Sequence, residues 1–156
     1  MASNISLPVD GGKFNLRTGA IIFQNKSVLL CKNDGNNNYY VIGGRDTFGE
    51  STEEAIVREV REETKQKFSV DRLVFINENF FTFAKTGEKC HELCFYYLMK
   101  SRGNIELPKP VEESYGTVRF YWIPLSELSD IILLPKFLKS ELKALPNSTL
   151  HVVTRQ

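Results

Sequence analysis

Three glutamates in the middle of the chain are spaced so that they could bind one cation. Glu59, Glu62 and Glu63 lie in the segment EAIVREVREET, and intervals of three and four residues place them on one face of a helix, one turn apart. Carboxylates in this arrangement repel one another, at a cost of about 0.2–0.5 kcal/mol per pair in an isolated helix. Mg²⁺ would offset that cost, because it takes oxygen ligands and commonly bridges carboxylates to substrate phosphates.

The same charges have a second interpretation, a solvated helix held by ion pairs. Arg58 can pair with Glu54 and with Glu62, each four residues away. These pairs would leave Glu59 and Glu63 without a partner on their own helix. Because charge runs are usually solvated faces, the spacing of the acids alone favours ion pairs over a metal site.

The helix that carries these acids has a recognisable start. Ser51 is a good N-cap, and Glu54 three residues later completes a capping box. Glu53 and Glu54 also complement the dipole in the first turn. A narrow stripe that recurs at helical spacing predicts the buried face of the helix, and its members are Ala55, Ile56, Val60 and Thr64.

Strands are expected on both sides of this helix. Before it, alternation and turn residues predict strands at 17–23, 27–32 and 39–42, a turn at 24–26 and a loop at 33–38. After it, strands are expected at 72–84, 89–99 and 117–123, with a turn at 85–88 and a loop at 103–116. Short helices at 125–128 and 135–145 and a small edge strand at 150–153 complete the prediction. The fold class is therefore mixed α/β.

A longer pattern around the acids reverses the preference for ion pairs. The spacing is G-x5-E-x7-R-E-U-x-E-E, where U is aliphatic, and the residues are Gly44, Glu50, Arg58, Glu59, Val60, Glu62 and Glu63. At average residue usage, six fixed positions would match by chance with odds on the order of 10⁻⁵. The pattern resembles the Nudix box, the signature of the Nudix hydrolases, over Gly44 to Gln66. The family pattern ends x-G-U, whereas this chain has Lys65 and Gln66 in the last two places. That departure concerns how the helix ends more than the chemistry.

The resemblance implies both a fold and an activity. The implied fold is a Nudix-like α/β/α sandwich with a mixed, partly antiparallel sheet, and residues 1–156 are expected to form one domain. The implied activity is that of a hydrolase of phosphorus-containing anhydrides. Such enzymes cleave a pyrophosphate bond in a nucleoside diphosphate linked to another group X, by attack of water on phosphorus with the help of Mg²⁺ or Mn²⁺. The alternative is a catalytically silent Nudix-fold domain that binds a nucleotide or regulates, and loss of the box acids would favour it. The sequence does not identify X.

The resemblance also implies roles for single residues. Glu59 and Glu63 match the main metal ligands, and Glu62 matches a further ligand or an acceptor of hydrogen bonds from groups around the metal. The carbonyl of Gly44 (or Gly43) matches an additional ligand. The three glutamates are also the catalytic candidates of the box. Glu50 and Arg58 match positions that pair to fix the loop onto the helix.

Candidates outside the box are fewer. In some family members the general base is an acid from the loop before the Trp-containing strand, and here that loop offers Glu113, with Glu112 as the alternative. Arg45, directly after the glycines, could contact a phosphate. Tyr40 and Phe81 are among the aromatic residues on which a purine could stack.

Composition excludes other classes of partner. The 156 residues carry a formal charge of +1, which argues against a protein that coats nucleic acid or an anionic membrane by bulk charge. No apolar run approaches the length of a membrane span. A nucleotide-like small molecule is therefore the expected partner, and a homodimer is left open.

The cysteines indicate a reducing compartment. Cys31, Cys90 and Cys94 are few and odd in number, which argues against a disulfide framework and favours the cytoplasm. The segment CHELC suggests a zinc site only superficially. In a strand Cys90 and Cys94 would share a face while His91 points the other way, and no second ligand pair exists.

Overall fold

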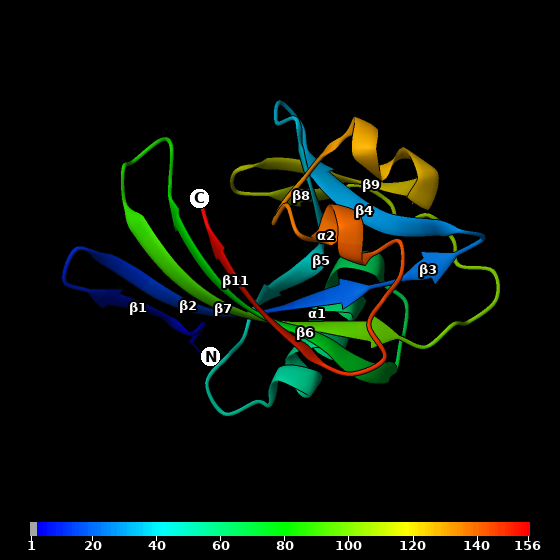
Figure 1. Cartoon of the computed structure of the whole chain (residues 1–156), viewed down its shortest axis with the longest axis horizontal. Helices are drawn as coiled ribbons and strands as arrows, with labels where there is room; N and C mark the ends of the chain where they lie inside the picture. The colour runs from blue at the N-terminus through cyan, green and yellow to red at the C-terminus, as the bar shows by residue number, and fades with distance from the viewer. Residues whose placement is uncertain (1–2) are drawn as a thin grey trace.

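The computed structural model describes residues 3–156 and confirms the mixed α/β fold (Figure 1). The main sheet has the strand order β11-β6-β7-β2-β5-β4-β9-β8, with β1 on β2, β3 on β4 and β10 on β5. The strands are β1 (Ser6–Val9), β2 (Gly12–Ile21), β3 (Phe23–Gln24), β4 (Ser27–Asn33), β5 (Asn38–Arg45), β6 (Val70–Thr82), β7 (Lys89–Met99), β8 (Val111–Glu113), β9 (Gly116–Pro124), β10 (Ile132–Leu133) and β11 (Leu150–Arg155). The helices are α1 (Thr52–Thr64), α2 (Leu138–Glu141) and the 3₁₀ helix η1 (Leu125–Asp130).

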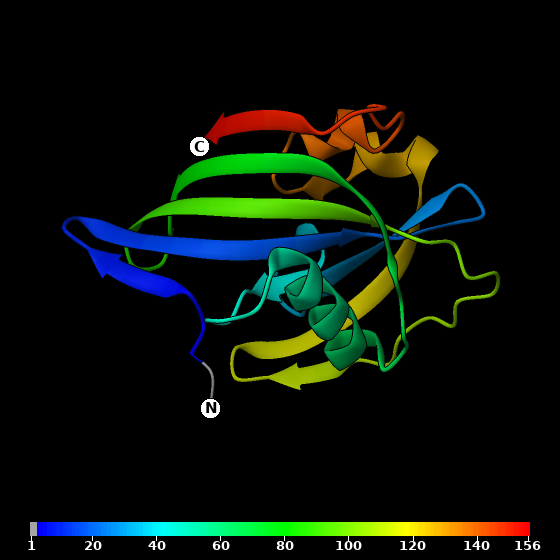
Figure 2. The same ribbon diagram turned by 90° about the horizontal axis from the view of Figure 1, so that it is seen from below.

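Helices cover both faces of the sheet, and this explains the unbroken apolar runs in its central strands. Ala20 of β2 belongs to the core cluster that contains Ile56 of α1. The next residue, Ile21, belongs to a second cluster with Leu138 and Leu142. Because successive side chains of a strand point to opposite faces, a strand buried on both sides needs apolar residues at consecutive positions. Figure 2 shows the long strands between α1 and α2, which is the expected α/β/α sandwich.

The N-terminal hairpin was not expected. Strand β1 pairs antiparallel with the first residues of β2, which begins at Gly12 and not at Arg17. The turn between them contains Gly11 at φ +85°, a conformation that glycine adopts without strain. Pro8 weakens the strand signal of SLPV, and a proline is tolerated here because β1 lies at an edge.

Two further expectations need correction. The loop expected at 103–116 contains the short strand β8, which pairs with β9. The helix expected at 135–145 is reduced to the four residues of α2. Strand β8 has only three residues and forms a tight hairpin with β9, in which Glu113 pairs with Gly116.

The edge strand expected at 150–153 is confirmed as β11, at the end of the sheet beside β6. Among residues 3–156, no helix is both long and apolar enough to cross a membrane.

Candidate functional site

The helix α1 is fixed at both ends by local interactions. The hydroxyl of Ser51 accepts a hydrogen bond from the backbone N–H of Glu54, whose carboxylate accepts one from the N–H of Ser51 at 2.7 Å. The predicted capping box is therefore confirmed. At the other end Lys65 adopts φ 62°, the left-handed conformation that a glycine would take more easily, and its N–H bonds the carbonyl of Arg61.

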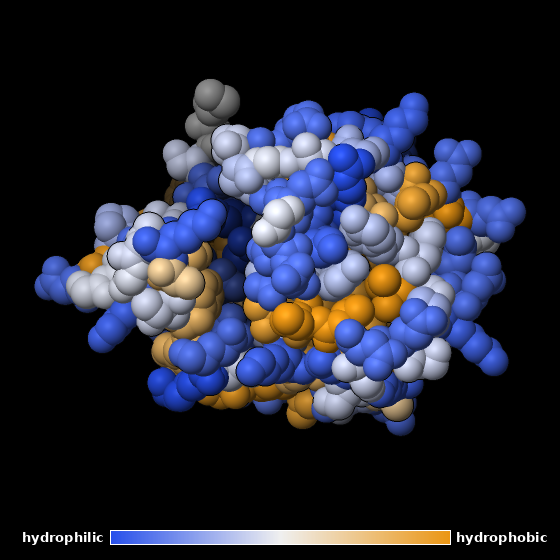
Figure 3. Space-filling view, turned by 90° about the horizontal axis from the view of Figure 1, so that it is seen from above, coloured by the Kyte–Doolittle hydropathy of each residue, from blue (hydrophilic) through white to orange (hydrophobic). Residues whose placement is uncertain are grey.

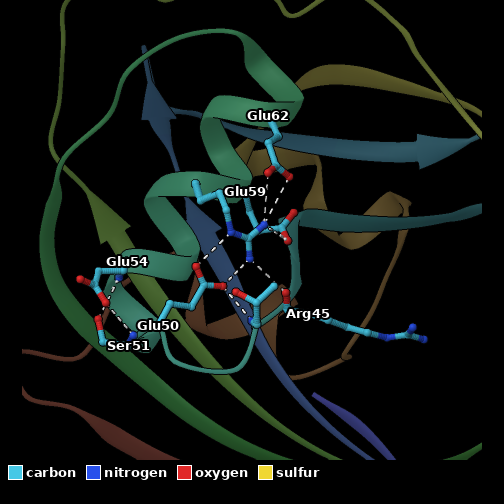
Figure 4. Close-up of polar contacts among 8 residues, drawn as sticks. Arg45, Glu50, Ser51, Glu54, Glu59 and Glu62 are labelled. Atoms are coloured by element: carbon cyan, nitrogen blue, oxygen red, sulfur yellow. Dashed lines mark hydrogen bonds and ion pairs between the residues drawn. The ribbon is translucent and has the colours of Figure 1, made fainter. Parts of the chain in front are cut away.

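Arg58 is the centre of the polar network on this helix (Figure 4). Its guanidinium donates to Glu50 through Nε at 3.0 Å, to Glu59 at 2.9 Å and to Glu62 at 3.3 Å. It also donates to the backbone carbonyl of Arg45. The Arg58 guanidinium lowers the pKa of Glu50 to about 2. Arg58 thus ties the loop after β5 to the helix, as the sequence predicted for the pair with Glu50.

Two ion-pair expectations for this network were wrong. Arg58 does not pair with Glu54, because that carboxylate closes the capping box. Glu59 has a partner on its own helix, since Arg58 reaches the adjacent side chain. Spacing rules for an isolated helix did not anticipate either contact, because the loop carboxylate of Glu50 draws the arginine towards the start of the helix.

Gly44 gives the β5 backbone close access to Glu59. A Cβ atom at this position would lie 2.3–2.4 Å from the carboxylate atoms of Glu59, so only glycine leaves room for them. Burial raises the pKa of Glu59. The carboxylate is therefore held against a strand backbone in a place where water screens it poorly.

Glu63 is the carboxylate with the least compensation in the site. Its Oε2 atom is buried and has no hydrogen-bond partner among the described residues. Burial, followed by the neighbouring charges of Glu59 and Glu113, raises the pKa of Glu63 to about 8. Arg17 is the nearby positive charge that opposes this effect. A buried carboxylate without a partner is costly, and a cation would remove the cost.

The carboxylate oxygens of Glu59, Glu62 and Glu63 suit a hard cation, although the three side chains do not converge on one point. Within residues 3–156, no three His, Cys, Asp or Glu side chains form a group that could hold a metal ion as they stand. The reason is that Glu59 and the largely exposed Glu62 turn towards Arg58. The unpartnered oxygen of Glu63 and the space that Gly44 leaves beside Glu59 nevertheless fit an oxygen-liganded divalent cation.

A cleft of about 510 Å³ opens beside these acids, within the range of ligand sites. Figure 3 shows the molecule hollowed between the lobe at its left and its centre. Of the residues predicted from sequence, the cleft is lined by Glu63, Glu113, Arg45, Tyr40 and Phe81. Figure 4 shows the Arg45 side chain extending away from the network of Arg58.

The two acids offered as a general base lie in different surroundings. Glu113 lines the cleft and raises the pKa of Glu63 through its charge. Glu112 does not line it; both of its carboxylate oxygens accept a hydrogen bond from Thr117, at 2.9 and 3.0 Å. Adjacent residues of a strand point to opposite faces, which explains the difference.

Sequence reasoning missed several residues that line the cleft. Arg17 lies directly opposite Arg45 in the β2–β5 ladder, so two guanidinium groups face the same space. Asn79 and Glu92 are polar residues within the long strands β6 and β7, and both line the cleft. Polar residues interrupting the inward-facing positions of β6 and β7 are the signal that could have identified them.

Asp46 is a second buried acid close to the site. It is fully buried, and both of its carboxylate oxygens lack a hydrogen-bond partner among the described residues. Burial raises the pKa of Asp46 to about 6. This side chain adds unfavourable charge next to the loop that Glu50 and Arg58 hold.

Comparisons with known proteins show the family and the fold of the chain. The NUDIX domain family model matches residues 13–147. A NUDIX hydrolase from Nitrosomonas europaea has 23% identity and a TM-score of 0.57, covering 83% of this chain and 86% of that chain. A MutT protein from Bacillus halodurans has 19% identity and a TM-score of 0.60, covering 88% and 89%. An ADP-ribose pyrophosphatase from Streptococcus suis has 18% identity and a TM-score of 0.55, covering 89% and 98%. No curated protein gives a significant match.

Proposed function

The chain belongs to the Nudix family, and on that premise we propose that it is a Mg²⁺-dependent hydrolase of a pyrophosphate bond in a nucleoside diphosphate linked to another group X. The observation that carries the proposal is the buried, unpartnered carboxylate oxygen of Glu63 beside Glu59. A buried carboxylate without a partner destabilises the protein, and such residues are typical of sites where a bound ligand supplies the missing partner. A cation shared with substrate phosphates supplies that compensation.

The metal ligands follow from the positions of the acids. Glu59 and Glu63 would hold the cation together with the carbonyl of Gly44, and Glu62 would join them by turning away from Arg58. When bound, Mg²⁺ (or Mn²⁺) supplies positive charge to the pyrophosphate oxygens and makes water a better nucleophile. Glu50 and Arg58 keep the loop in register with the helix, so that the backbone of Gly44 stays beside Glu59.

Glu113 is the acid that we assign as general base. It lies in the cleft with Glu63, whereas Glu112 is engaged by Thr117. In this role Glu113 accepts the proton of the water that attacks phosphorus. An ionised carboxylate held within reach of the attacking water can serve as a general base.

The remaining lining residues suit a nucleotide-like small molecule. Arg45 makes no ion pair among the described residues and would contact a phosphate. Tyr40 and Phe81 offer aromatic faces to a base. The structural relatives named as a MutT protein and an ADP-ribose pyrophosphatase are in line with this class. We further propose that residues 1–156 act as one domain in the cytoplasm, where the three free thiols stay reduced.

A substrate panel in Mg²⁺ tests the proposal. The panel contains nucleoside triphosphates, ADP-ribose, a UDP-sugar and a dinucleoside polyphosphate, with release of phosphate, pyrophosphate or nucleotide as the readout. Glu63→Gln is expected to lower kcat/KM by roughly 10²-fold or more. Glu112→Gln is the matched control and should stay within about twofold, because a surface carboxylate that faces away from the cleft contributes little.

Metal binding provides a second readout that does not depend on turnover. Titration with Mn²⁺ followed by electron paramagnetic resonance should show weaker binding in Glu63→Gln and unchanged binding in Glu112→Gln. A parent protein that binds Mn²⁺ and nucleotide but hydrolyses no member of the panel would instead be the silent binding domain. Full activity in Glu63→Gln would refute the metal assignment.

A further inference from the structure

Glu92 on β7 is a carboxylate with almost no partner inside the protein. Its side chain is only 12% exposed. The nearest cation is Arg17, whose Nε lies 3.8 Å from one carboxylate oxygen, which is too long for a hydrogen bond. Among residues 3–156 no donor reaches either oxygen. Glu92 lines the cleft, so its two acceptor oxygens are available to a ligand there.

Asn79 on β6 presents a donor beside these acceptors. It is the cross-strand partner of Glu92 in the antiparallel β6–β7 ladder, so the two side chains lie next to each other on one face. Its Oδ1 accepts hydrogen bonds from Thr154 at 2.7 Å and from Gln156 at 3.3 Å. With the oxygen of the amide turned to these two donors, its Nδ2 is left to donate into the cleft.

An aromatic ring completes this group of cleft residues. Phe81 is two residues from Asn79 and therefore lies on the same face of β6. Its ring meets that of Phe83 edge-on, with centroids 5.0 Å apart, and both line the cleft. The floor of the cleft thus combines two acceptors, one donor and an aromatic neighbour, and the candidate metal acid Glu63 lines the same cleft.

We propose that Glu92 and Asn79 recognise the base of the substrate and select guanine. The guanine edge carries two adjacent N–H donors, on N1 and N2, followed by the acceptor O6. The two donors match the oxygens of Glu92, and O6 matches the Nδ2 of Asn79. Phe81 contacts the face of the ring. The inference rests on the proposed function, since it assigns the base of a substrate that the same cleft would cleave.

The other bases leave part of this arrangement unsatisfied. Adenine and cytosine each offer one amino group next to a ring nitrogen that accepts, so one oxygen of Glu92 would face a lone pair. Uracil offers a single N–H between two carbonyl groups. A buried acceptor left without a donor loses affinity out of proportion to the one contact, which makes the selection steep.

Binding of nucleoside monophosphates in EDTA tests the inference without metal or turnover. Calorimetry on the unaltered protein should rank GMP above IMP, which lacks the 2-amino group, and IMP above AMP and CMP. Each lost hydrogen bond to the carboxylate should weaken binding by roughly 10- to 100-fold. Glu92→Gln, which has nearly the same shape but only one acceptor, should bring GMP to the affinity of AMP.

Glu78→Gln is the control, because Glu78 precedes Asn79 on the opposite face of β6, where it bonds His151. It should leave the ranking unchanged. Equal affinity for GMP and AMP in the unaltered protein would overturn the inference even if Glu92→Gln did not fold. A preference for AMP or CMP would also overturn it.

Hydrolysis separates this inference from the proposed function. In Mg²⁺ the kcat/KM for GTP should exceed that for ATP, and Glu92→Gln should remove the difference. If all nucleotides are cleaved equally, the guanine assignment fails while the hydrolase proposal stands. If none is cleaved yet GMP binds selectively in EDTA, the hydrolase proposal fails while Glu92 keeps its role.

Discussion

One added methyl group at Gly44 is expected to lower the catalytic rate by about 10²-fold while leaving the fold almost unchanged. The Cβ of alanine would lie 2.3–2.4 Å from the carboxylate of Glu59, whereas ordinary contacts begin at 3.4 Å. The carboxylate must therefore retreat by about 1 Å, and a displacement of that size from the productive geometry costs about 10²-fold in rate. The stability cost should stay below about 1 kcal/mol, because the atoms displaced are the end of a flexible side chain.

Gly43 provides a matched comparison with the opposite outcome. A Cβ there would lie 2.1 Å from the carbonyl oxygen of Thr18, a backbone atom of the neighbouring strand β2. That atom cannot move without spreading the β2–β5 ladder, so Gly43→Ala should lower the free energy of unfolding by about 1–3 kcal/mol or more. The two variants differ by one position and add the same group.

The assay measures kcat/KM on the best substrate of the panel, Mn²⁺ affinity, and urea unfolding for both variants. Gly44→Ala should lose activity and metal affinity at nearly parental stability, and Gly43→Ala should lose stability first. Gly44→Ala with parental activity and metal affinity would refute the placement of Glu59 in the metal site. Equal destabilisation of both variants would show that the glycines serve only the packing of β5.

Three further predictions concern charge and backbone around the site. The depressed pKa of Glu50, about 2, implies stability that is present above its unfolded pKa of 4.5 and lost as the pH falls towards 2. Glu50→Gln should therefore lower the free energy of unfolding in urea by about 1–2 kcal/mol at pH 7. The difference between the variant and the parent should shrink below pH 4. A difference that stays constant with pH would contradict the role of the Glu50 charge. Asp46 affects stability in the opposite direction, because its pKa of about 6 lies above the unfolded value of 3.8. Its contribution to the free energy of unfolding is fully present below about pH 4 and is lost as the pH rises through 6. Asp46→Asn should be more stable than the parent by about 2–3 kcal/mol at pH 7 and equal to it at pH 4 in the same assay, and an equal gain at both values would point to packing. Lys65→Gly should raise the thermal midpoint, with about 0.5–1 kcal/mol gained from relief of the left-handed conformation. A lower midpoint would contradict this and would show that the bond from Lys65 Nζ to the carbonyl of Glu62 contributes more than the backbone.

The sequence predicted those parts of the site that local interactions determine. The capping box of Ser51 and Glu54 and the buried stripe with Ile56 and Val60 lie within one helix, so residue spacing sufficed to place them. The left-handed Lys65 follows the same logic, since the helix must end where the family pattern has glycine, whichever residue stands there. The partners of Arg58 did not follow, because the competing carboxylate of Glu50 comes from the preceding loop.

Residues of the cleft floor could not be placed from sequence, because strand register determines which of them meet. Asn79 and Glu92 are thirteen positions apart and become neighbours only through the β6–β7 ladder. A slip of one residue would turn either side chain to the other face of the sheet. The parallel pairing of β2 with β7 brings Asn15 beside Glu92, a contact that no local pattern records.

The metal site and the cleft floor therefore depend on the fold in different ways. The box acids Glu59, Glu62 and Glu63 all belong to α1, so spacing within one helix sets their positions, and the sheet adds the space that Gly44 of β5 leaves for Glu59. Glu92 and Asn79 keep their relation only while β6 and β7 keep their register, which the whole sheet enforces. Substitution of two cleft residues on an unchanged ladder would thus alter the selected ligand without disturbing the carboxylates that would hold the cation. We therefore expect residues of β6 and β7 to determine which base this protein selects, and the acids of α1 to determine which bond it cleaves.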